Sequence, residues 1–206
     1  LGIVTSINGG VRYACETIGM ASHAGTTPMR LRHDAGYCAA AISVFMRELT
    51  IEMGGAQVAT MGVTKLHPNL INVIAARAVV TVDLRNTDEA MLKIAEQKLA
   101  DFLVKLAAKE GVTITSHRLA RFEPVKFDDS IADLIAQHAQ ALGYSCRSMT
   151  SGAGHDAQMM ARLCPSAMIF VPSVKGISHN PAEHTEVKDL VAGGNVLLQT
   201  ILELTK

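Results

Sequence analysis

The sequence contains no tryptophan, and aromatic residues make up only 4% of its 206 residues. Hydrophobic residues nevertheless make up 49%, so we expect a core built from alanine, valine, leucine, isoleucine and methionine. A chain of this length can bury one large core or two small ones. Charged residues make up 18%, which is below the ~25% of typical domains. We therefore expect that more of this surface than usual is covered by something else.

An excess of charge and long apolar runs are also absent. Lys+Arg and Asp+Glu both number 19, so there is no basic surface of the kind that attracts nucleic acid or anionic membranes. No apolar run approaches the ~18 residues of a membrane span. The four cysteines show no Cys-x-x-Cys spacing, which favours buried thiols over disulfides and a cytoplasmic location. We expect neither nucleic acid nor membrane as a partner.

The first 120 residues predict the order β-α-β-β-α-β. Alternating residues predict strands, and apolar residues at intervals of three and four predict helices. The helices are expected over Cys38–Leu49 and from a cap at Thr87 to Gly111, and the strands at Val11–Thr17, Gln57–Val63, Val80–Leu84 and Val112–Leu119. This order is typical of the ferredoxin-like arrangement, in which two helices cover one face of a four-stranded antiparallel sheet.

The pattern changes near Arg121–Ser130. Ser130 is expected to cap a helix that ends at Gly143, and strands are expected at Cys146–Met149 and Ala167–Val171, with a closing helix from about Glu186. Such alternation predicts part of a parallel α/β sheet with only two or three strands. We therefore predict one domain over residues 11–119 and a second, incomplete domain over residues 1–10 and 120–206.

Two histidine motifs have a functional and a plain interpretation of comparable weight. In "SHAGTTP", His23 lies on a turn, where an exposed imidazole could donate a hydrogen bond to an oxyanion; alternatively it is only a turn residue before a helix. In "SGAGHDA", Gly152 and Gly154 allow close approach of a ligand to the backbone, and Asp156 opens a helix. The alternative is a strand-to-helix turn with a helix cap.

Two further candidates are weaker when taken alone. Arg85 is expected on the sheet face opposite Val80, Val82 and Leu84, where its guanidinium could bind a carboxylate together with Asn72; a surface contact between Arg85 and Asp83 is the likelier alternative. His179, in "ISHNPAEH", follows an apolar strand and could ligate a metal. One histidine is not a zinc site, because zinc takes three or four ligands.

Five motifs occur in an order that resembles one family: "HAGTTPM", "PNLINV", "VDLR", "SGAGHDA" and "GISHNPAEHT". This is the hydantoinase/carbamoylase family of two-metal amidohydrolases, within the aminoacylase and carboxypeptidase-like clan. The resemblance covers essentially all 206 residues. It implies hydrolysis of the carbamoyl or ureido C–N bond of a small ureido acid, two divalent ions (zinc, manganese, nickel or cobalt), and a homodimer formed through residues 11–119, the lid domain.

The resemblance also assigns roles to individual residues. It implies that His23 polarises the scissile carbonyl in the active site of the partner subunit, and that Asn72 and Arg85 bind the substrate carboxylate. Gly152, Ala153 and Gly154 would help to hold the substrate, with His155 lining the site. His179 would be a metal ligand.

The chain departs from the family in one large respect. The family's first half supplies most of the metal ligands and the general base, and no such segment occurs here, so we expect a C-terminal half that is inactive alone and does not fully bind the metals. The alternatives are a non-catalytic module for dimerisation or carboxylate binding, and a dipeptidase or aminoacylase of the same clan. The sequence selects neither the substrate nor the metal.

Overall fold

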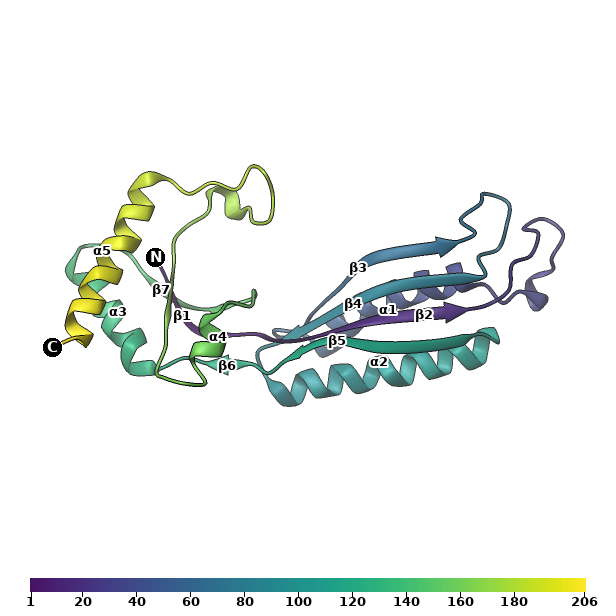
Figure 1. Ribbon diagram of the computed structural model, residues 1–206, viewed down its shortest axis with the longest axis horizontal. Helices are drawn as coiled ribbons and strands as arrows, with labels where there is room; N and C mark the ends of the chain where they lie inside the picture. The colour runs from purple at the N-terminus through teal and green to yellow at the C-terminus, as the bar shows by residue number, and fades with distance from the viewer. The chain divides into compact units, whose positions relative to one another are not determined.

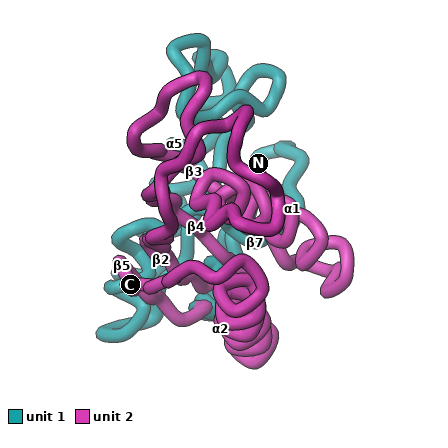
Figure 2. Tube along the Cα trace, turned by 90° about the vertical axis from the view of Figure 1, so that its right-hand side faces the viewer, with its two compact units in different colours: residues 1–8, 125–206 teal, residues 9–124 magenta.

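The computed structural model describes residues 1–206, and the chain forms two compact units. Unit 1 comprises Leu1–Asn8 and Val125–Lys206, and unit 2 comprises Gly9–Pro124 (Figure 2). The expected boundaries after residues 10 and 119 differ from these by two and five residues. The mixed α/β class that the sequence predicts is confirmed, since each unit combines a sheet with helices.

Unit 2 is a four-stranded antiparallel sheet with two long helices on one face (Figure 1). Its strands lie in the order β3-β4-β2-β5. Along the chain the elements are β2 (Gly9–Ile18), α1 (Ala35–Met53), β3 (Val58–His67), β4 (Arg77–Asn86), α2 (Glu89–Glu110) and β5 (Thr113–Phe122). The unit therefore has the β-α-β-β-α-β order.

The core of unit 2 lies between the sheet and the helices. Alternate residues of β4 are buried from Ala78 to Leu84, and α1 buries Ile42, Met46 and Leu49 against them. Burial of a side chain of this size contributes about 1.5–3 kcal/mol relative to exposure. The remaining β4 side chains, including Arg85, lie on the opposite face of the sheet, as predicted.

The helix caps differ from those expected. The cap of α2 is Asp88, whose carboxylate accepts a hydrogen bond from the Met91 N–H (2.8 Å), and not Thr87. The cap of α3 (Asp129–Ala141) is Asp128, which accepts from the Ile131 N–H (3.0 Å), and not Ser130. In both places a hydroxyl residue and an aspartate are close in sequence, and the charged carboxylate is the better acceptor for a helix N-terminus.

Strand β3 is longer than the sequence predicts. Lys65, Leu66 and His67 lie beyond the expected end of the strand at Val63, but they continue the ladder with β4, pairing with Val79, Ala78 and Arg77. The strand ends where the cis peptide bond between His67 and Pro68 turns the chain. The expected end at Val63 was wrong because the pairing partner could not be seen in the sequence.

Unit 1 is a smaller mixed sheet with helices. Its elements are β1 (Gly2–Ile7), β6 (Val125–Lys126), α3, β7 (Arg147–Ser151), α4 (Ala157–Met160), β8 (Met168–Phe170) and α5 (Val187–Leu204). The central strand is β1, which pairs in parallel with β7 and antiparallel with β6 and β8. The expectation of a parallel sheet therefore holds for one pair only, because strand direction is not encoded in hydrophobic periodicity.

Helix α5 is amphipathic, but its larger apolar side chains face away from the core of unit 1. Its buried residues are Ala192, Gly193, Thr200 and one branched aliphatic residue, Val196. The side chains that it exposes, each about half accessible, are Leu190, Val191, Leu197, Leu198, Ile201 and Leu202. We call these six residues the α5 stripe. None of the helices combines the length and apolar character that a membrane span requires.

Candidate functional site

His23 lies on a tight turn whose backbone fixes the orientation of the ring. Its Nδ1 accepts hydrogen bonds from the Gly25 N–H (2.9 Å) and the Thr26 N–H (3.2 Å). A ring nitrogen that accepts carries no proton, so the neutral ring carries its proton on Nε2. His23 is exposed, and its Nε2–H is therefore available to donate to a ligand.

Asn72 lies beside the turn that carries His23. The Asn72 carbonyl accepts a hydrogen bond from the Ala24 N–H (3.0 Å), and His23 forms an isolated β-bridge with Val73. A further bond joins the Ile74 N–H to the Ser22 carbonyl (2.8 Å). Two predicted site residues that are 49 positions apart in sequence thus belong to one local structure.

Arg85 lies at the other end of unit 2. It is eight residues beyond Arg77 on β4, which corresponds to about 27 Å at the rise of an antiparallel strand. Asn72 precedes Arg77 and lies beyond that end of the strand. No small acid spans this distance, so Asn72 and Arg85 of one chain do not meet at one ligand, and the expected role of both residues in carboxylate binding stays a prediction.

The guanidinium of Arg85 is already engaged with Asp83. Arg85 donates from Nε and Nη2 to the two carboxylate oxygens of Asp83, each at 2.8 Å, and Arg12 donates to the same carboxylate. Burial would raise the pKa of Asp83, but the hydrogen bonds from Arg85 and Arg12 outweigh it and lower that pKa. The bond to Asp83 raises the pKa of Arg85. The contact between Arg85 and Asp83, the plainer interpretation of the sequence, is present.

Residues Gly152–His155 form an exposed turn after β7. The His155 Nδ1 accepts a hydrogen bond from the Ala157 N–H at the start of α4 (3.1 Å), which again directs the ring proton to Nε2. Asp156 was expected to open and cap a helix, but its side chain makes no capping bond and α4 has only four residues. His155 therefore takes the place at the helix start that the sequence suggested for Asp156.

His179 lies on a loop, nine residues after Phe170, the last residue of β8. Its backbone N–H donates to the Glu183 Oε2 (2.8 Å), and its φ of 56° is in the left-handed region. No three histidine, cysteine or carboxylate side chains of the chain come together in a geometry that could hold a metal ion. Since zinc takes three or four ligands, the donors of this chain alone do not fit a metal centre.

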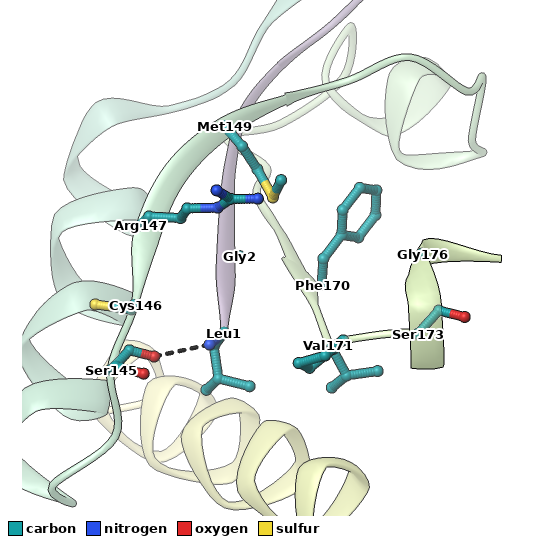
Figure 3. Close-up of a pocket in the computed structure, with 11 residues that line it drawn as sticks. Leu1, Gly2, Ser145, Cys146, Arg147, Met149, Phe170, Val171, Ser173 and Gly176 are labelled. Carbon is teal, nitrogen blue, oxygen red and sulfur yellow. Dashed lines mark hydrogen bonds between the residues drawn. The ribbon is translucent and has the colours of Figure 1, made fainter. Parts of the chain in front are cut away.

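A cavity of about 700 Å³ opens in unit 1 but contains none of the predicted site residues. Its apolar lining includes Leu1, Met149, Phe170 and Val171, which come from β1, β7 and the segment around β8, and Arg147 lies at its edge (Figure 3). Three further lining residues, Ser145, Cys146 and Ser173, carry a hydroxyl or a thiol. No carboxylate or imidazole lines the cavity, so the usual general bases for hydrolysis are absent from it.

One residue with a direct contact to the His23 turn was not singled out from the sequence. Arg32 donates from Nη2 to the Ala24 carbonyl (2.7 Å) and from Nε to the Thr27 carbonyl (3.0 Å). The motif "HAGTTPMRLR" contains two arginines, and charge alone does not distinguish Arg30 from Arg32. Only the folded turn shows which one is engaged.

The chain matches one protein family over most of its length. The model of peptidase family M20/M25/M40 matches residues 9–203. The chain belongs to this family. Enzymes of the family generally depend on divalent metals, and the predicted resemblance to hydantoinase/carbamoylase amidases is confirmed by the relatives and solved structures.

Three relatives show how far the similarity extends. Allantoate amidohydrolase of Escherichia coli is 35% identical over 99% of this chain and 50% of its own length. N-carbamoyl-L-amino-acid amidohydrolase of Rhizobium meliloti is 34% identical over 98% and 49%, respectively. The crystal structure of a hydantoinase/carbamoylase family amidase from Burkholderia multivorans superposes with a TM-score of 0.91 at 36% identity, covering 97% of this chain and 49% of that one. This chain therefore spans about half the length of the relatives it matches.

Proposed function

We propose that this chain supplies the substrate-binding half of an amidohydrolase that cleaves the C–N bond of a small ureido acid. The observation that carries the proposal is the orientation of His23, whose Nδ1 accepts two backbone N–H groups and leaves Nε2–H exposed. Such a donor stabilises the negative charge that develops on a carbonyl oxygen during attack by water. The named activities of the relatives, on allantoate and N-carbamoyl-L-amino acids, support the ureido class.

The geometry of unit 2 supports a site shared between two copies. His23 and Asn72 lie at one end of the unit and Arg85 at the other. If one substrate meets all three, the two ends must come from different subunits, which a homodimer with two-fold symmetry provides. In this arrangement His23 and Asn72 act on the partner's substrate, and Arg85 binds the carboxylate of the substrate in its own subunit.

Arg85 would bind the substrate carboxylate while its own guanidinium is held by Asp83. The bidentate bond to Asp83 fixes the plane of the guanidinium, and the planar fork of arginine matches the geometry of a carboxylate. Pre-organisation of this kind orients a substrate at low entropic cost. Gly152, Ala153, Gly154 and His155 are exposed on one turn of unit 1 and are proposed to line the substrate site.

The metal centre that the family implies cannot be completed by this chain. His179 is its candidate ligand, and no second and third ligand lie with it. We propose that a segment equivalent to the unmatched half of the relatives supplies the other ligands and the group that activates water. The 206 residues alone are expected to hydrolyse nothing.

Two uncovered apolar surfaces of unit 1 support the need for such a segment. The α5 stripe exposes six large aliphatic side chains, and the cavity beside Met149 and Phe170 leaves the sheet open. Monomeric proteins seldom leave large apolar patches in water.

The proposed function places the protein in the cytoplasm and requires neither nucleic acid nor a membrane as a partner.

The test compares the 206-residue chain with a family-length protein, in which the unmatched half of E. coli allantoate amidohydrolase is joined ahead of Leu1. Allantoate and N-carbamoyl-L-amino acids are offered with zinc, manganese, nickel or cobalt. Only the family-length protein should release product, and His23→Ala should lower its kcat about 100- to 1000-fold, the usual loss for one oxyanion donor. His117→Ala, an exposed histidine on β5, is the matched control.

The alternative from another class is a module that binds carboxylates without chemistry. It gains support if the 206-residue chain binds N-carbamoyl amino acids by calorimetry while the family-length protein hydrolyses none of them. A dipeptidase or aminoacylase specificity is tested in the same assay with dipeptides and N-acetyl amino acids.

A further inference from the structure

We propose that Arg32 is a positioning residue that holds the His23 turn and thereby keeps the ring proton on Nε2. The role of Arg32 in catalysis rests on the function proposed above, whereas its contacts with the His23 turn lie within unit 2. The side-chain hydrogen bonds of Arg32 go to the backbone carbonyls of Ala24 and Thr27 and not to the ring. It acts through the backbone that the ring is bonded to.

The ring orientation of His23 depends on the shape of the turn from His23 to Thr27. The N–H groups of Gly25 and Thr26 donate to the ring, and the Thr27 N–H donates to the His23 carbonyl (3.2 Å). All three donors belong to the turn itself. A turn of five exposed or half-exposed residues has few apolar contacts to hold it, so contacts from outside the turn help to fix its shape.

Arg32 provides this anchor at two points. Its guanidinium accepts nothing and donates to the carbonyls of Ala24 and Thr27, one on each side of the peptide groups that bind the ring. Hydrogen bonds from a charged donor are about twice as strong as neutral ones. The planar fork of arginine spans both carbonyls at once, which the single ammonium of lysine cannot do in the same geometry.

The anchor also connects the two candidate site residues. The Ala24 carbonyl accepts from Arg32, and the Ala24 N–H donates to the Asn72 carbonyl. Loosening of Ala24 would therefore disturb both His23 and Asn72. Arg30, two residues earlier, is exposed and makes no hydrogen bond or ion pair, so it offers a matched control on the same segment.

The test uses the 206-residue chain and reads the protonation of the His23 ring directly. Two-bond ¹H–¹⁵N spectra in alkaline buffer are recorded for the wild type, Arg32→Met and Arg30→Met, with His23→Gln to assign the signals. In the wild type and Arg30→Met, one ring nitrogen should be protonated and the other an acceptor. In Arg32→Met the two nitrogen signals should move towards each other as the tautomers mix, and amide exchange at Gly25 and Thr26 should accelerate about tenfold.

The inference is overturned if Arg32→Met leaves the His23 ring signals unchanged while the amide spectrum of unit 2 remains that of a folded protein. If Arg32→Met does not fold, Arg32→Lys decides the question. An intermediate shift supports the inference, and a wild-type ring spectrum contradicts it. Failure of the proposed function would appear separately, as absence of ureido hydrolysis by the family-length protein with the tautomer effect intact.

Discussion

The two units differ most clearly in where their helices direct large apolar side chains. Helix α1 in unit 2 buries Ile42, Met46 and Leu49 almost completely, whereas α5 in unit 1 turns the α5 stripe outward and buries small residues such as Ala192 and Gly193. Unit 2 has one continuous core of 18 buried residues, and unit 1 has two small clusters on opposite faces of its sheet. Unit 2 thus has the larger closed core, and α5 of unit 1 leaves most of its large apolar side chains half exposed.

The first way to test this comparison is to truncate one aliphatic side chain in each unit. Ile42→Ala should lower the free energy of unfolding of unit 2 by about 3 kcal/mol, because it leaves a cavity in a closed core. Leu198→Ala should change that of unit 1 by no more than about 0.5 kcal/mol, since its side chain is already half in water. Urea unfolding followed by amide exchange in each unit measures both values, and equal losses would contradict the comparison.

Asp83 gives unit 2 a pH dependence that can be predicted in sign. Its pKa is lowered in the folded state by Arg85 and Arg12 against the effect of burial, so the stabilisation is present above the unfolded-state pKa and is lost as the pH falls through the folded-state pKa. Asp83→Asn should destabilise unit 2 by about 1 kcal/mol at neutral pH and by progressively less in acid. Thermal unfolding of both proteins across that range would refute the assignment if their difference stayed constant.

Two adjacent glycines of α5 distinguish the inner and outer faces of the helix. A Cβ at Gly193 would lie 2.6 Å from the Val171 Cγ1, whereas a Cβ at Gly194 would meet nothing. Gly194→Ala should therefore stabilise unit 1 by about 0.5–1 kcal/mol through helix propensity, and Gly193→Ala should destabilise it. If the two variants shift the melting temperature in the same direction, the orientation assigned to α5 is wrong.

The smallest expected difference between the two units is in the reactivity of their thiols. Its measurement requires no mutation. Cys15 and Cys38 are buried in unit 2, and burial raises the pKa of each to about 11. Cys164 in unit 1 is exposed. In the native protein near pH 8, a thiol reagent should label Cys164 within minutes and leave Cys15 and Cys38 unlabelled until denaturant is added, because thiolates are the reactive form. Mass mapping of labelled peptides checks this.

Hydrophobic periodicity predicted the elements of unit 2 well because that unit buries one face of each element. The stripe of Cys38, Ile42, Met46 and Leu49 is buried as expected. The expected end of a strand was wrong where pairing with a neighbouring strand decides it. Lys65–His67, for example, extend β3 because they pair with β4. The mixed direction of the sheet in unit 1 also depends on partners that the sequence does not show.

The sequence indicated candidate site residues, but it did not indicate which of them lie together in the fold. The turn at His23 was recognisable from its small residues, yet its contact with Asn72 depends on two segments that meet only in the fold. Asn72 and Arg85 flank one strand, and the length of that strand separates them within the chain, which the sequence motifs do not show. Arg32 was missed because an arginine that binds carbonyls has the same sequence signature as one in solvent.

The separation of Asn72 and His23 from Arg85 provides the most direct test of a site shared between two subunits. In the family-length protein, His23→Ala and Arg85→Ala are each expected to be almost inactive. When the two inactive variants are mixed and allowed to exchange subunits, half of the dimers are hybrids with one intact site, so about a quarter of the wild-type activity should return. If mixing restores nothing while hybrid dimers are detected by mass spectrometry, both residues act within one subunit and the shared site is contradicted.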